Sequence, residues 1–76
     1  MEKVILIDPE ILGGTPVFVG TRVPIKNLFD YLATGESVDE FIYDFDTVRK
    51  EQAVSVLNLS KQLVETSASF LYENIA

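Results

Sequence analysis

Four polar residues near the start of a predicted third helix carry side chains that could read DNA. They are Arg49, Lys50, Gln52 and Ser55, and Asn58 lies one turn beyond. Arginine and lysine bind guanine edges or phosphates, whereas glutamine and asparagine suit adenine. A third helix that follows two shorter ones is the element that enters the major groove in helix-turn-helix proteins. An ordinary solvated helix surface has a similar composition, so both interpretations stay open.

A fifth candidate for nucleic-acid contact is Arg22, which lies in a rigid stretch of glycine, proline and β-branched residues. The planar guanidinium group bonds equally well to a phosphate or to a carboxylate. It could therefore contact DNA, or it could pair with Asp8 or Asp30 and fix the surrounding segment to the next helix. Of these two interpretations the carboxylate pairing is favoured.

The sequence lacks the residues that most enzymes and metal sites use. Among its 76 residues there is no histidine and no cysteine, so the commonest general bases, nucleophiles and metal ligands are missing. The pair Gly13-Gly14 is followed by no Gly-Lys-Ser/Thr element and is not a phosphate-binding loop. Glu40 and Asp44 share a helix face, but clustered carboxylates on an exposed helix usually serve solubility. We expect no enzymatic activity, no cofactor and no metal.

Negative charge opposes DNA binding in this chain. The net charge is −6, and non-specific nucleic-acid affinity depends mainly on neutralising phosphates. The predicted second helix and its flanks supply five carboxylates, from Glu36, Asp39, Glu40, Asp44 and Asp46. In helix-turn-helix complexes the helix before the recognition helix crosses the phosphate backbone. Such a helix would repel DNA here.

Residues 1–24 are predicted to form a β arm. Glu2–Ile7 is rich in β-formers and ends at the turn signal Asp8-Pro9. Val17–Val23 is predicted to form a hairpin with a tight turn at Val19-Gly20, where glycine adopts a positive φ at little cost. Both faces of the first strand are apolar, so it must pair with something. Pairing with the hairpin of the same molecule and pairing with a second copy both stay open.

Residues 25–65 are predicted to form a three-helix, homeodomain-like helix-turn-helix core. The first helix ends at Gly35, a typical C-terminal cap, and Ser37 with Glu40 has the spacing of a capping box. A third, longer helix is expected to start at a cap formed by Asp46 or Thr47. The fold class is therefore mainly α with a small N-terminal β arm, in one domain.

Residues 66–76 are predicted to form an apolar interaction tail. Serine and threonine residues between Thr66 and Ser69 are expected to weaken the helix. Two apolar stripes on the third helix indicate a neighbour on each side. The candidate partner-binding residues are Leu59, Leu63, Phe70, Leu71 and Tyr72. Equally, the tail could close the core by covering the first strand.

Several motifs resemble the domain of unknown function 433 family. They are Ile7-Asp8-Pro9, Gly14, Pro16, Gly20-Thr21-Arg22-Val23 and Gly35-Glu36-Ser37, within a match from about Val4 to about Leu63. The resemblance implies a homeodomain-like helical core and a VapB-type antitoxin, encoded in many cases beside a PIN-like nuclease. This chain has Phe45-Asp46 where the family usually has an aromatic residue followed by proline.

These observations together predict an antitoxin-like protein that forms a homodimer and binds a PIN-like ribonuclease toxin, with residual operator binding. The alternatives are a DNA-binding regulator without a toxin and a dimeric adaptor that binds no nucleic acid. Hydrophobic residues make up 47% of the chain, more than one small domain needs, and this supports dimerisation. The absence of cysteine fits the cytoplasm, and no apolar run is long enough for a membrane span.

Overall fold

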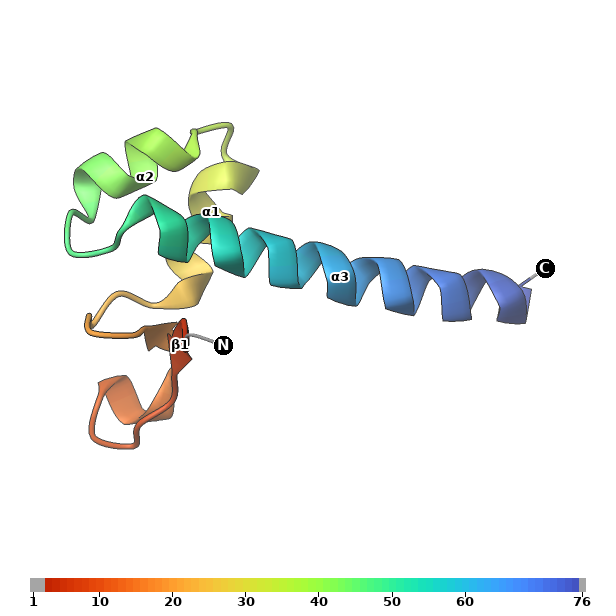
Figure 1. The fold of residues 1–76 in the computed structure, drawn as a ribbon, viewed down its shortest axis with the longest axis horizontal. Helices are drawn as coiled ribbons and strands as arrows, with labels where there is room; N and C mark the ends of the chain where they lie inside the picture. The colour runs from red at the N-terminus through yellow and green to blue at the C-terminus, as the bar shows by residue number, and fades with distance from the viewer. Residues whose placement is uncertain (1–2, 76) are drawn as a thin grey trace.

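The computed structural model describes the backbone of residues 3–75 and the side chains of residues 3–68. Three helices and a two-stranded antiparallel sheet make a mainly α fold with a small β arm, as predicted. In chain order the elements are β1 (Ile5–Leu6), a 3₁₀ turn η1 (Leu12–Gly14), β2 (Val17–Phe18), α1 (Ile25–Ala33), α2 (Val38–Asp44) and α3 (Lys50–Ile75). In Figure 1, α1, α2 and the β arm surround the first half of α3, and its second half extends away from this body.

The N-terminal strand pairs within its own molecule. In the sheet, Ile5 lies opposite Phe18 and Leu6 opposite Val17. The Val19 amide donates to the Val4 carbonyl at 2.9 Å, which extends the pairing by one residue. Of the two alternatives for this strand, intramolecular pairing with the hairpin is confirmed.

The predicted turn at Val19-Gly20 is also confirmed. Gly20 has φ of +80°, and the Thr21 amide donates to the Phe18 carbonyl at 3.0 Å. The returning half of the hairpin is shorter than predicted, because it pairs with β2 through one isolated bridge between Val17 and Pro24.

Local sequence signals set the junction between α1 and α2. Gly35, with φ of +90°, follows the end of α1, and its amide donates to the Leu32 carbonyl at 3.1 Å. Ser37 then caps α2: its Oγ accepts from the Glu40 amide at 3.1 Å, and the Ser37 amide donates to the Glu40 carboxylate at 2.9 Å. The predicted capping box is confirmed.

The predicted start of α3 at Asp46 or Thr47 is wrong, since the helix begins at Lys50. A turn precedes it, closed by the Val48 amide donating to the Phe45 carbonyl at 3.0 Å. Val48 is 1% exposed, and Phe45 packs against the core. The turn allows both apolar side chains to face inward, and this burial outweighs the local capping preference of the aspartate and threonine.

The predicted weakening of α3 between Thr66 and Ser69 is also wrong, because the helix is continuous to Ile75. Hydroxyl groups can bond back within a helix without ending it. Ser60 shows this, since its Oγ donates to the Val56 carbonyl at 2.9 Å while the helix continues.

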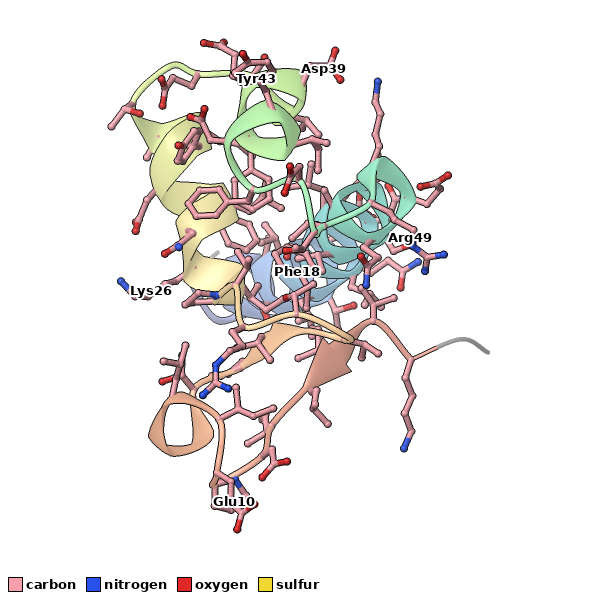
Figure 2. All side chains as sticks on the ribbon, turned by 90° about the vertical axis from the view of Figure 1, so that its left-hand side faces the viewer. Glu10, Phe18, Lys26, Asp39, Tyr43 and Arg49 are labelled. Atoms are coloured by element: carbon pink, nitrogen blue, oxygen red, sulfur yellow. The ribbon has the colours of Figure 1, made fainter. Side chains whose placement is uncertain are left out.

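The core joins β2, α1, α2, α3 and the turn before α3. Its buried residues are Phe18, Leu28, Phe41, Val48, Ala53 and Val56. Phe18 lies at the centre of the body in Figure 2. Phe41 stacks edge-on against Tyr31, with ring centroids 5.4 Å apart. The buried part of α3 therefore ends near Val56, well before the helix does.

Candidate functional site

Two of the predicted DNA-contacting residues are exposed at the start of α3. Arg49 precedes the helix and Lys50 is its first residue, and both side chains are exposed. Arg49 lies on the outer side of the helix start in Figure 2. The ammonium group of Lys50 is 3.0 Å from a carboxylate oxygen of Asp39 on α2. Lys50 is thus already paired with the acidic helix beside it.

Gln52 was predicted to be exposed for contact with DNA bases, and its predicted exposure is wrong. It is 6% exposed. Its Oε1 accepts from the Arg49 amide at 2.9 Å, and its Nε2 donates to the Val19 carbonyl at 2.9 Å. The side chain therefore closes the first turn of α3 and ties the helix to the β arm. Its spacing from Arg49 is that of the returning arm of a capping box, a signal present in the sequence.

Ser55 is half-buried, so less of its side chain is available to contact a DNA groove than the sequence predicts. Of the four helix residues predicted to contact DNA, only Arg49 and Lys50 lie fully on the surface.

The five carboxylates on α2 and its flanks are all exposed: Glu36, Asp39, Glu40, Asp44 and Asp46. Several have structural partners of their own. Asp44 accepts a hydrogen bond of 2.6 Å from the Tyr31 hydroxyl. This bond to a carboxylate raises the pKa of Tyr31 to about 12, and desolvation and the nearby negative charges add to the rise.

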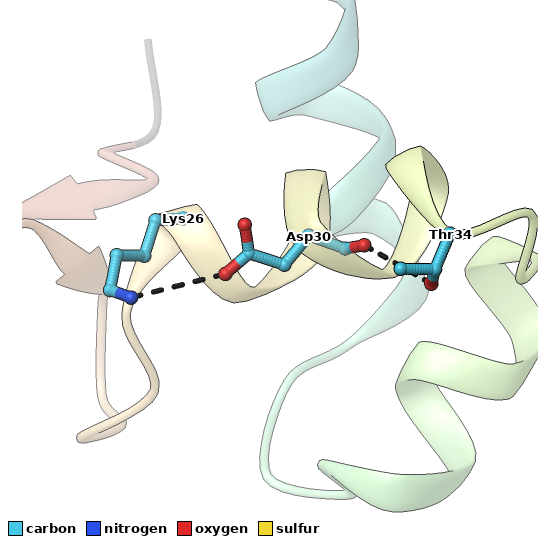
Figure 3. A network of polar contacts seen from close by, with 3 residues as sticks. All are labelled: Lys26, Asp30 and Thr34. Atoms are coloured by element: carbon cyan, nitrogen blue, oxygen red, sulfur yellow. Dashed lines mark hydrogen bonds and ion pairs between the residues drawn. The ribbon is translucent and has the colours of Figure 1, made fainter.

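Arg22 does not make the predicted pairing. Asp30 pairs instead with Lys26, at 3.9 Å and one helical turn away, and its carbonyl accepts from the Thr34 hydroxyl at 3.2 Å (Figure 3). Asp8 accepts from the Glu10 amide at 2.9 Å and so caps its own turn. The two carboxylates bind local donors two and four residues away, which costs less chain ordering than a pairing with the more distant Arg22.

Arg22 borders an open, mainly apolar hollow of about 580 Å³. The other residues around it are Leu6, Ile11, Gly20, Thr21, Val23 and Thr47. The Thr21 hydroxyl donates to the Phe18 carbonyl and accepts from the Val23 amide. Both of these hydrogen bonds of the Thr21 hydroxyl lie within the turn. Among the residues around the hollow, Arg22 carries the charge.

The second half of α3 carries an exposed apolar face. Leu59 is 41% exposed, Leu63 69% and Val64 66%. At 100° per residue, Leu63 and Val64 lie on either side of the line that runs through Val56 and Ser60. The stripe that packs against the body therefore continues past it without a partner. We call Leu59, Leu63, Val64 and Ala68 the α3 apolar face.

Charged residues lie off this face. Lys61 and Glu65 form an ion pair of 3.9 Å along the helix. Between Leu63, Val64, Ser67 and Ala68 the surface is slightly hollowed. The side chains of Phe70, Leu71 and Tyr72, which were also predicted to bind a partner, lie outside the described residues.

The described residues form neither a metal-type cluster nor a membrane-type helix. They include no group of three or more histidine, cysteine, aspartate or glutamate residues that could hold a metal ion. Within the same part of the chain, no helix has the length and apolar character needed to cross a membrane.

Comparison with known proteins places the body of the molecule in a family. The family model described as "Protein of unknown function (DUF433)" matches residues 5–58 of this chain. That range covers the β arm, α1, α2 and the packed start of α3, and it ends immediately before Leu59. An uncharacterized protein, y4eO, from Sinorhizobium fredii (strain NBRC 101917 / NGR234) is 36% identical over 50 residues. These residues are 66% of this chain and 23% of that relative, so the match covers under a quarter of its length. No solved structure matches the chain.

Proposed function

The chain belongs to the DUF433 family, and from this premise we propose that it is an antitoxin-like protein that dimerises and binds a PIN-like ribonuclease toxin. It acts in the cytoplasm by occupying its partner and has no catalytic role. The observation that carries the proposal is the α3 apolar face, which extends beyond the body with Leu63 and Val64 about two-thirds exposed.

An extended apolar helix is well suited to a groove on another protein. Leu59 and Leu63 are one turn apart, which is the spacing of anchors in helix-in-groove complexes. Isolated helices of this length are marginal in water without packing. Binding therefore stabilises the second half of α3 as well as removing its apolar side chains from water. The anchors proposed on this helix are Leu59, Leu63, Phe70, Leu71 and Tyr72.

Charge supports a partner with a basic surface. The chain has a net charge of −6, and the carboxylates around α2 are all exposed. A ribonuclease must present a positive face to its RNA substrate, and opposite charges accelerate association and favour the correct partner. The acidic body would lie over that face while α3 occupies an apolar groove.

The second candidate function is operator binding, and the exposed pair Arg49 and Lys50 favours it. These residues lie at the start of the third helix, where a recognition helix contacts bases. Gln52 is buried and Lys50 is paired with Asp39, so this surface has fewer polar side chains available to contact DNA bases. Arg22 on the β arm is a further candidate for a phosphate contact.

A gel-shift titration on the DNA upstream of the gene tests operator binding. Binding that weakens steeply with salt and disappears in the Arg49→Ala, Lys50→Ala double variant supports it. Salt-insensitive or absent binding contradicts it.

Affinity capture from the native host tests the main proposal. We expect the full chain to recover a PIN-like nuclease, and a Leu63→Lys, Val64→Lys variant to lose it. The matched control is Gln62→Lys, which adds a charge at an exposed position on the side of the same helix away from the α3 apolar face. Recovery of the homodimer alone, over several growth conditions, would contradict the proposal.

A further inference from the structure

The outer edge of β1 has backbone groups with no partner. The Val4 carbonyl accepts from the Val19 amide, so the hydrogen bonds to β2 fall on Val4 and Leu6, and Ile5 lies opposite Phe18 without bonding to it. In an antiparallel pair the intervening residue directs its N–H and C=O away from the partner strand. The amide and carbonyl of Ile5 thus point outward, and among the described residues neither has a hydrogen-bond partner.

Apolar side chains accompany this open edge. Ile5 is 40% exposed and Ile7, two residues along, is 64% exposed. Residues two apart on a strand share a face. An unpaired strand edge with exposed isoleucines is a template for a further strand.

The opposite side of the sheet is closed. The Phe18 amide donates to the Val23 carbonyl at 3.0 Å, and the Ile25 amide donates to the Pro16 carbonyl at 2.9 Å. The segment before α1 therefore covers the outer edge of β2. Since the described part of each molecule has one open sheet edge, strand addition through it between copies ends at two and does not continue into a fibre.

We propose that β1 pairs antiparallel with β1 of a second copy across a twofold axis. In the register that places Ile5 opposite Ile7 of the second copy, residues whose backbone N–H and C=O groups point outward lie opposite each other. Symmetry repeats the pair, which gives two hydrogen-bonded residue pairs and four bonds.

Charge favours a second copy as the occupant. In the same register Lys3 of one copy lies beside the turn of the second copy that carries Asp8 and Glu10. Lys3 and Glu10 are exposed. Each end of the paired strands thus brings one cation near an acidic turn, and a twofold axis supplies this arrangement twice. An unrelated strand would need to reproduce the complementarity by chance.

This inference deepens the dimerisation part of the proposed function, and it is tested without the nuclease. Sedimentation equilibrium of the full chain should show a reversible monomer–dimer equilibrium. Ile7→Lys, which puts like charges beside each other at the axis, should weaken association by at least about tenfold, or 1.4 kcal/mol. The matched control is Leu12→Lys, an exposed position on the arm away from the edge.

A second measurement follows the backbone itself. Protection of the Ile5 and Ile7 amides from hydrogen exchange should rise with protein concentration, whereas that of the Val19 amide, already bonded within the molecule, should not. A monomer at all concentrations overturns the inference. A dimer that withstands Ile7→Lys but is lost in Leu63→Lys, Val64→Lys also overturns it, because the copies then meet through α3. Nuclease capture by Ile7→Lys separates the outcomes, since loss of the strand pairing leaves the α3 apolar face intact.

Discussion

At the scale of single residues, polar side chains hold the elements of this small protein together. Gln52 links α3 to the β arm by donating to the Val19 carbonyl at 2.9 Å, and it closes the first turn of α3 by accepting from the Arg49 amide at 2.9 Å. Tyr31 on α1 links to Asp44 at the end of α2 by a bond of 2.6 Å. The Gln52–Val19 and Tyr31–Asp44 bonds join residues far apart in the sequence, so each helps to fix how separate elements are placed.

Replacement of Gln52 by leucine tests the first of these links. Gln52→Leu removes both bonds and leaves the Val19 carbonyl and the Arg49 amide without their partners. We expect the free energy of unfolding to fall by about 1–3 kcal/mol, since an unsatisfied polar group costs about this much. Urea denaturation measures it. Gln62→Leu, at an exposed position on the same helix, should change stability by under about 0.5 kcal/mol. An equal effect of both substitutions would contradict the structural role of Gln52.

The Tyr31 hydroxyl gives a prediction at alkaline pH. The hydrogen bond to Asp44 raises the pKa of Tyr31 from 10.0 to about 12. Because the folded value lies above the unfolded one, the stabilisation is present below pH 10 and is lost as pH rises from 10 to 12. The tyrosinate absorbance that the natural sequence shows and the Tyr31→Phe variant lacks reports the titration of Tyr31. Asp44→Asn should return the pKa towards 10; a titration that Asp44→Asn leaves unchanged would refute the assigned cause.

At the scale of elements, short signals decide where helices begin and end. The capping box of Ser37 and Glu40 starts α2, and Gly35 allows the chain to leave α1 with a positive φ. Because α2 has only seven residues, its ends contribute a large share of its stability.

Removal of the cap tests this dependence. Ser37→Ala should lower the free energy of unfolding by about 1 kcal/mol, because the Glu40 amide loses its acceptor. Ser37→Asp retains an acceptor and should keep most of the stability. Thermal unfolding of the three proteins distinguishes them, and an alanine variant as stable as the aspartate variant would contradict the capping role.

Elements with a local signal could be predicted from the sequence, and those set by distant contacts could not. The turn at Val19-Gly20 and the capping box depend on residues a few positions apart, so both were predicted correctly. The start of α3 depends on Phe45 and Val48 reaching the core together, which no local pattern shows. Gln52 and Arg22 were misjudged for a related reason, since a polar side chain near a helix start or a turn can face inward or outward. Three-dimensional packing alone decides which.

At the scale of the whole molecule, the dominant feature is the division of α3 into a packed half and an extended half. The molecule measures 44 × 30 × 24 Å, and α3 accounts for its long axis (Figure 1). The family match ends at Asn58, where the helix leaves the body. The shared body thus presents a helix extension whose apolar residues face water, and a partner that accepts this extension is the central claim.

Inhibition of RNA cleavage tests that claim most directly. A PIN-like nuclease captured with the protein is titrated with the full chain, with Leu63→Lys, Val64→Lys, and with the control Gln62→Lys. We predict that the natural sequence and the control inhibit cleavage at near-equal stoichiometry, and that the double variant requires at least about a hundredfold more protein. Equal inhibition by the double variant, or no inhibition by the natural sequence, would contradict the account.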